Sequence, residues 1–151
     1  MKTIKSFIVM LAALLSIGAK AAETVTIPTT AGTYINWNDC DLTGASVENS
    51  GANIGSTGAS TVATFTISNT TQQDYILTFA TGSKNAATMQ VTLTNTANSN
   101  VVLTKSVDIL NTGNWTLSTI NNIFLSQLPA GTYELKFQVT AATSYAGNWG
   151  K

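Results

Sequence analysis

Short runs of alternating apolar and polar residues, separated by polar turns, are the feature that most constrains the fold of this chain. Such runs occupy residues 61–68, 74–80, 89–94 and 132–139, and further apolar runs begin at residues 101 and 120. Successive side chains of a strand point to opposite faces, so each alternating run predicts a strand with one buried face. Strands of this length and spacing, without a helical period between them, predict an all-β fold. The expected architecture is a β-sandwich with jelly-roll topology.

The first 21 residues match a secretory signal peptide of bacterial style. Two lysines precede the apolar stretch 7–15, and residues 19–21 (Ala-Lys-Ala) fit the small-x-small cleavage rule. This stretch is shorter than the roughly 20 apolar residues that span a bilayer, and no later stretch is longer, so we expect no membrane span. We predict cleavage after Ala21 and an exported domain at 22–151. Its location would be secreted, periplasmic or at the cell surface.

Charge and residue types exclude several classes of function. Without residues 1–21 the chain keeps four lysines and seven acidic residues, a net charge of −3, and the sequence contains no arginine or histidine. A nucleic-acid partner requires a basic face that binds phosphates, and this chain supplies none. No histidine is present to activate a nucleophile. The acidic residues show no pairing typical of a hydrolase. We therefore predict a protein that is not an enzyme.

The single cysteine, Cys40, lies in a run of polar side chains. In an exported chain it predicts a buried small apolar group, the alternative being a reactive or intermolecular thiol. Four side chains around it carry oxygens: Asn36, Asn38, Asp39 and Asp41. Hard cations bind several oxygens, but the spacing of a calcium loop and its bidentate glutamate is missing. Turn capping is the simpler interpretation, and we predict no metal and no cofactor.

A tight turn, residues 112–115 (Thr-Gly-Asn-Trp), separates two of the expected strands. Gly113 permits a positive φ, and Asn114 tolerates one better than most residues. The turn can therefore present Trp115 at the rim of a loop. A tryptophan ring is costly to leave in water and usually packs against something. Two interpretations stay open at this point: the ring closes one end of the core, or it stacks on the flat face of a ligand.

The order of motifs around this turn resembles carbohydrate-binding modules of families 6 and 35, which are galactose-binding-like β-sandwiches. The turn at 112–115 is followed by Leu-Pro-Ala-Gly-Thr-Tyr-Glu-Leu at 128–135 and by Asn148 in a late loop, and the likeness covers about residues 53–150. It implies a non-catalytic module that binds a polysaccharide or oligosaccharide and is accessory to a secreted, linked glycoside hydrolase. The resembled modules often hold a structural calcium through an E-x-E pattern. Residues 23–25 (Glu-Thr-Val) lack that pattern, so we do not predict a structural calcium from the resemblance.

The resemblance also implies a site. Aromatic rings stack on the C–H face of a sugar, amides hydrogen-bond its hydroxyls, and loops on a rigid sandwich collect such residues. Trp115 would supply the stacking face and Asn148 would bind a ring hydroxyl. In the resembled modules a second aromatic often faces this tryptophan, but here its position is occupied by Ser56. The predicted ligand-binding residues are Trp115, Asn148, Asn114, Tyr34, Trp37 and Tyr145.

The end of the sequence carries a further expectation. In the resembled modules the late loop leads into a final strand that completes a sheet, whereas this sequence ends at Lys151. We expect that strand to be missing or truncated, as in a fragment. An unpaired sheet edge is a template for pairing with another chain. The alternative function is therefore a structural or adhesive β-sandwich whose sheet is completed by a partner's strand.

Overall fold

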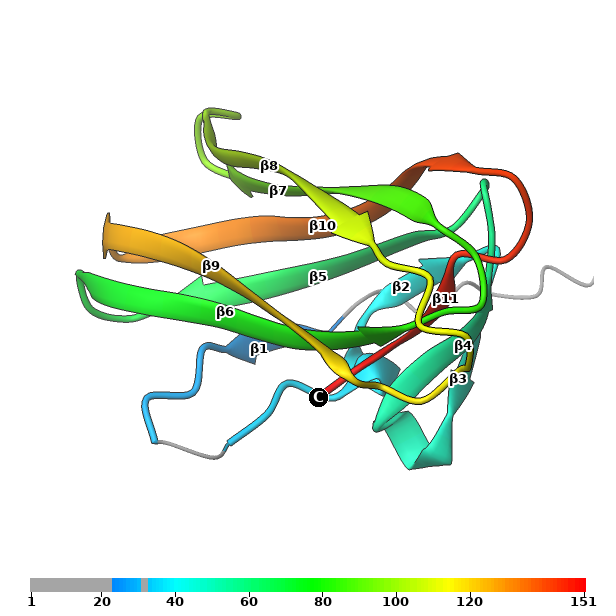
Figure 1. The fold of residues 1–151 in the computed structure, drawn as a ribbon. Coiled ribbons are helices and arrows are strands. Elements are labelled where there is room, and N and C mark those ends of the chain that lie inside the picture. The colour runs from blue at the N-terminus through cyan, green and yellow to red at the C-terminus, as the bar shows by residue number, and fades with distance from the viewer. Residues whose placement is uncertain (1–22, 31–32) are drawn as a thin grey trace, which may run out of the picture.

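Eleven strands and two short 3₁₀ helices form the residues that this computed structural model describes, 23–30 and 33–151 (Figure 1). The strands are β1 (Thr24–Thr26), β2 (Asp41–Thr43), β3 (Ser46–Glu48), β4 (Asn53–Thr57), β5 (Val62–Asn69), β6 (Gln73–Gly82), β7 (Ala87–Asn95), β8 (Val101–Ile109), β9 (Thr119–Leu128), β10 (Gly131–Ala142) and β11 (Gly147–Gly150). The helices are η1 (Trp37–Asp39) and η2 (Asn49–Gly51). In the described part of the chain, no helix has the length and apolarity needed to cross a membrane. The predicted signal peptide, residues 1–21, lies outside the described residues.

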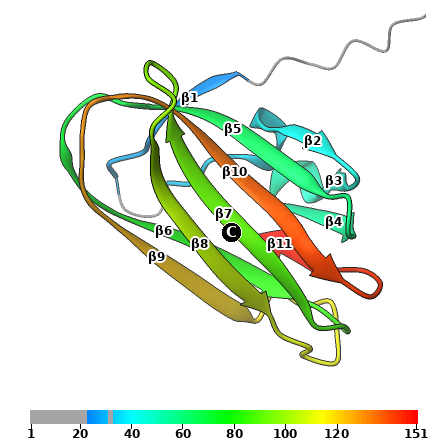
Figure 2. The ribbon, with the colours of Figure 1, turned by 90° about the horizontal axis from the view of Figure 1, so that it is seen from above.

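Two sheets face each other across the core. One has the strand order β1-β5-β10-β7-β8, with β2 also paired to β5, and the other has the order β3-β4-β11-β6-β9. Figure 2 shows β5, β10, β7 and β8 side by side. From β4 onward the chain crosses between the sheets at every connection except the β7–β8 hairpin. This alternation is the jelly-roll pattern of connections, so the predicted fold is confirmed.

The alternating runs fill the core as their period predicts. In β10 the buried positions are Tyr133, Leu135, Phe137 and Val139, and the residues between them are more exposed. Phe137 makes an edge-on contact with Phe79 of β6, at 5.3 Å between ring centroids. Aromatic rings from both sheets therefore interlock in the centre of the sandwich.

Trp37 belongs to this core, which corrects its prediction as a ligand-binding ring. Only 5% of its surface is exposed, and its ring lies 5.3 Å from that of Phe65 and 5.5 Å from that of Phe137. The local cause is a cap: the Asn36 side chain accepts a hydrogen bond from the backbone of Asn38 and begins η1, which turns the ring inward. Asn36 thus has the predicted capping role.

β11 lies in the middle of its sheet, between β4 and β6. It pairs with only three residues of β6, from Ala80 to Gly82. Among the described residues, no strand pairs with the same edge of β6 over residues 73–79. Of the strand expected at the end of the sequence, the structure contains four residues, Gly147–Gly150.

Candidate functional site

The loop between β8 and β9 and the loop between β10 and β11 come together at one end of the sandwich (Figure 1, yellow and red). There they border a cleft of about 320 Å³, together with residues from β3 and β4. The cleft is lined by Glu48, Ser56, Trp115, Tyr145, Gly147 and Asn148. Three of the six residues predicted from the sequence, Trp115, Tyr145 and Asn148, thus line one depression.

Hydrogen bonds within the turn at 112–115 fix its shape. Gly113 has a φ of +76°, as predicted. The side-chain oxygen of Asn114 accepts a hydrogen bond from the backbone of Thr116 at 2.8 Å, and its amide nitrogen donates to the carbonyl of Thr112 at 3.3 Å. Asn114 was predicted to bind ligand, but its amide is engaged inside the turn. Its role in this structure is to position Trp115.

The same loop is held against the end of β6. The backbone nitrogen of Thr112 donates to the carbonyl of Ser83 at 2.7 Å. Beside it the carbonyl of Thr116 approaches Gly82 so closely that a Cβ on that residue would lie 1.9 Å from the oxygen. Only glycine fits such an approach. The loop that carries Trp115 is therefore seated on the backbone of a core strand.

Trp115 is half-exposed and lies outside the buried core. Its ring meets that of Tyr145 edge-on, with 6.2 Å between centroids and 90° between planes. The ammonium of Lys84 lies 5.8 Å from the centroid of the Trp115 ring, within the range of a cation–π contact. Trp115 thus forms part of a surface cleft, whereas the alternative interpretation placed it at the end of the core.

Asn148 joins the two loops. It lies on β11, and its side-chain amide donates to the carbonyl of Trp115 at 3.1 Å. Within the described residues its side-chain oxygen has no hydrogen-bond partner. The preceding loop is held at its end by the backbone nitrogen of Ala146, which donates to the carbonyl of Thr57 at 2.8 Å. Asn148 therefore supports Trp115 and keeps an unused acceptor on the cleft.

Sequence reasoning missed Glu48 as a site residue. Its carboxylate accepts a hydrogen bond from the Asn53 side chain at 2.8 Å, which orients it beside the cleft. The β3–β4 pairing brings it there, and no local motif signals that pairing. Ser56, which the resemblance placed at the position of a second aromatic, has a φ of +57° and an exposed side chain on the cleft. It presents a small hydroxyl where the resembled modules often present a ring.

The structure does not bring Tyr34 into this cleft. Its ring is 61% exposed and lies beside the ammonium of Lys151, at 4.9 Å from the ring centroid. Tyr34 instead borders a second cleft, between the two sheets. Of the predicted ligand-binding aromatic residues Tyr34, Trp37 and Tyr145, Tyr145 is the one whose ring lies against Trp115.

The polar run around Cys40 shows no cation site. In the described part of the chain, no group of three or more His, Cys, Asp or Glu side chains could hold a metal ion. The Cys40 thiol is half-buried, packs against the core and donates to the carbonyl of Trp37 at 3.1 Å. Burial raises the pKa of this thiol to about 11. It is therefore a protonated packing group at neutral pH.

Comparisons with known proteins place the fold. No protein-family model matches the chain, and no curated protein matches it in sequence. Several solved structures, however, have a similar fold. The C-terminal CBM6 of LamC, a marine laminarinase from Zobellia galactanivorans, is 20% identical with a TM-score of 0.56, over 76% of this chain and 90% of that chain. A family 35 module from Clostridium thermocellum is 21% identical with a TM-score of 0.57, over 76% of this chain and 90% of that chain.

A third similar structure is the module CBM6cm-2 of Cellvibrio mixtus lichenase 5A, solved in complex with cellotriose. It is 19% identical with a TM-score of 0.53, over 76% of this chain and 88% of that chain. This chain has the fold of family 6 and family 35 carbohydrate-binding modules. The resemblance found in the turn at 112–115 and the motif at 128–135 is thereby confirmed for the fold.

Proposed function

We propose that this protein is a non-catalytic glycan-binding module and that its site is the cleft around Trp115. The observation that carries the proposal is the convergence of a half-exposed indole, a second aromatic ring and a free amide oxygen at one loop end of this fold. A sugar presents a flat apolar face and a rim of hydroxyls. Rings and amides are the groups that recognise those two features.

The cleft suggests how a sugar would lie. The Trp115 ring stacks on the C–H face, and Tyr145 borders that face at a right angle. The oxygens of Asn148 and Glu48 accept hydrogen bonds from hydroxyls. Because Ser56 leaves the opposite side open, one face of the sugar is held. One stacked face leaves little surplus over the cost of association, so we expect a Kd of roughly 1 µM to 1 mM.

The similar structures support this function and suggest the first ligands to try. One was solved with cellotriose, and another belongs to a laminarinase. Oligosaccharides of cellulose and laminarin are therefore the starting panel, followed by a broad glycan array. We further propose that the protein is exported and assists a polysaccharide-degrading enzyme, in the same chain or alongside it.

Trp115→Ala tests the site. The variant should lose about 1–3 kcal/mol of binding free energy, roughly a 5- to 150-fold rise in Kd, because it removes the stacking face. Calorimetry with the best ligand of the array measures this change. Tyr34→Ala is the matched control, since it removes an exposed ring outside the cleft. Its Kd should equal that of the wild type.

A thermal melt separates binding from folding. Trp115 lies outside the core, so the melting temperature of Trp115→Ala should stay close to that of the wild type. If the variant melts far below the wild type, and the wild type binds no glycan on the array, Trp115 stabilises the loop end and the proposed function is wrong.

A further inference from the structure

The strand β9 forms one edge of its sheet, whose strand order is β3-β4-β11-β6-β9. On one side β9 pairs with β6, in regular antiparallel register from Thr119 to Leu125. On its other side, no strand of the described residues pairs with it. In an antiparallel sheet, alternate residues direct their N–H and C=O groups to each neighbour. Half of the backbone groups of β9 therefore point away from β6 and have no partner strand.

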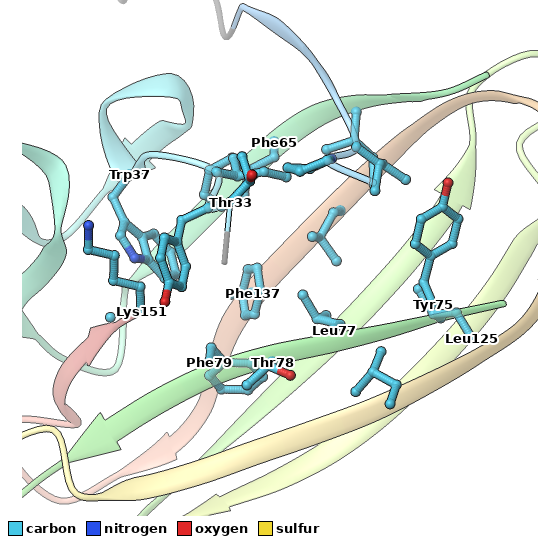
Figure 3. Close-up of a pocket in the computed structure, with 18 of the residues that line it drawn as sticks. Thr33, Trp37, Phe65, Tyr75, Leu77, Thr78, Phe79, Leu125, Phe137 and Lys151 are labelled. Atoms are coloured by element: carbon cyan, nitrogen blue, oxygen red, sulfur yellow. The ribbon is translucent and has the colours of Figure 1, made fainter. Parts of the chain in front are cut away.

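This edge is separate from the second cleft, which has a volume of about 410 Å³ and lies between the two sheets (Figure 3). Figure 3 shows Leu77 of β6 and Phe137 of the facing sheet in that cleft. Of the outward-facing residues of β9, Ile120 borders the cleft, whereas Asn122 and Phe124 do not. The last strand, β11, lies on the opposite side of β6. Residues in line with β11 would therefore have β6 between them and the edge of β9.

The other strands that end the two sheets carry protection that β9 lacks. The end strands β1 and β3 are each three residues long. The end strand β8 carries Lys105 opposite the buried Val91, which is an inward-pointing position. Short edge strands and inward-pointing lysines are two ways in which proteins prevent edge pairing. β9 is ten residues long and contains no charged residue and no proline, so its edge is open to pairing.

Apolar side chains line the outer face of the sheet at this edge. Ile120 and Phe124 of β9 are 60% and 61% exposed. Ile76 of β6, which lies opposite Phe124, is 64% exposed. Asn122 lies between Ile120 and Phe124 on the same face, because alternate residues of a strand share a face. Exposed apolar residues gathered at an open strand edge are typical of an interaction surface.

We propose that this protein forms a two-fold symmetric dimer in which β9 pairs antiparallel with β9 of a second copy, centred on Asn122. In this register Asn122 lies opposite the same residue of the second copy. Ile120 lies opposite Phe124 of the second copy, and Phe124 lies opposite Ile120. Pairs of an aromatic and a β-branched side chain stabilise neighbouring strands. The pairing joins two five-stranded sheets into one continuous sheet.

The shape and charge of the edge favour a second copy as the partner. The regular register ends after Leu125, where the β6–β9 pairing shifts. Gln127 has a φ of +47°, and its backbone nitrogen donates to Asp74 at 2.7 Å, which holds the chain in this irregular shape. The regular stretch, residues 119–125, is thus symmetric about Asn122.

A two-fold pairing of this stretch brings no like charges together. Without residues 1–21 the chain has a net charge of −3, but residues 119–125 carry no charge. Like charges directly opposite each other would destabilise a strand pair. A two-fold interface also uses the edge of each copy once, so assembly stops at the dimer.

Sedimentation velocity of the ligand-free protein between about 1 µM and 1 mM tests the proposal. Pairing over seven residues buries less surface than a standard protein interface, so we expect a dimer Kd of about 1–100 µM and no larger species. Hydrogen exchange of the amides in residues 119–125 should slow as the dimer forms.

Two charge variants at the centre of the edge test the register. Asn122→Lys and Asn122→Asp each place like charges opposite each other in the dimer, so each should raise the Kd at least about tenfold. Mixing the two variants should restore a mixed dimer, because opposite charges then meet. The control is Thr104→Lys, which adds the same charge at an exposed position on the edge strand β8 and should leave the Kd unchanged.

A thermal melt checks the fold of the variants, because both lose the exposed hydrogen bond that Thr78 donates to Asn122. If either variant at Asn122 fails to fold, Phe124→Ser replaces both and should weaken the dimer at least about tenfold. The proposal is overturned by a protein that stays monomeric at about 1 mM, or by Asn122→Lys or Phe124→Ser dimerising like the wild type. Folded lysine and aspartate variants that do not pair with each other also overturn it.

Discussion

The three tryptophans of this chain have different roles because of the backbone that holds each one. Trp149 occupies an inward position of β11 and is fully buried, and Trp37 is turned into the core by η1. Trp115 follows a glycine turn in a loop that lies on the end of β6, and its ring stays half-exposed beside Tyr145. The backbone context of each indole, rather than its residue type, decides whether it is buried in the core or stays exposed in a cleft.

Cys40 provides a residue-scale prediction. Burial raises the pKa of its thiol from 9.0 to about 11, so the reactive thiolate is about 100-fold scarcer at pH 8 than for an ordinary thiol. Alkylation by iodoacetamide should be slower by about that factor and should rise about tenfold per pH unit up to about pH 11. The same protein unfolded in guanidinium is the control and should react at the ordinary rate. Rapid alkylation of the folded protein at pH 8 would show an accessible, reactive thiol instead.

The site could be predicted from the sequence where one short motif determines the geometry. Gly113 implied a turn that could place Trp115 at a loop rim, and the family resemblance, rather than the turn itself, favoured the exposed ring that the structure shows. Trp37 was misplaced because closeness to a loop does not tell which way a ring points. Glu48 was missed because its place depends on strand pairing with Asn53, and no local pattern encodes that pairing.

At the scale of the elements, the strands with strict alternation were the predictable ones. The expected runs 61–68 and 132–139 correspond to β5 (Val62–Asn69) and β10 (Gly131–Ala142). The three-residue strand β2 is too short to show a period, and its long-range pairing with β5 defines it. The element that matters most for the site is the β8–β9 loop, whose position depends on the end of β6.

Gly82→Ala tests that dependence. The added methyl would meet the Thr116 carbonyl at 1.9 Å, so the loop must move away from β6. We expect a loss of about 1–3 kcal/mol in the free energy of unfolding, because overpacking forces the backbone to shift. We also expect weaker glycan binding, because Trp115 moves with the loop. Denaturant titration and calorimetry measure the two effects.

Gly58→Ala is the matched control for this substitution. No atom lies within 4 Å of the Cβ it would add, so stability and affinity should change little. If Gly82→Ala is as stable as Gly58→Ala and binds glycan equally well, the contact with β6 does not position the loop.

At the scale of the whole molecule, the sandwich separates its two clefts. One lies among the loops at an end and offers aromatic and amide groups, and the other opens between the sheets beside β6. Because their linings do not overlap, a ligand in one cleft would leave the other cleft accessible. Such a module would suit the surface of a cell or the space outside it, where it would meet the polysaccharide that we propose as its ligand.

That location depends on export, which is the last prediction. The sequence predicts cleavage after Ala21, and β1 begins at Thr24, so cleavage there leaves every described strand intact. Mass spectrometry of the exported protein should find Ala22 or a close neighbour at its N-terminus. In Ala21→Leu a large residue replaces the small residue required before the cleavage site. The uncleaved precursor should therefore accumulate, with its N-terminus at or next to Met1. Wild-type protein that keeps residues 1–21 in a membrane fraction would show that this segment is an anchor, and the export of a free module would be wrong.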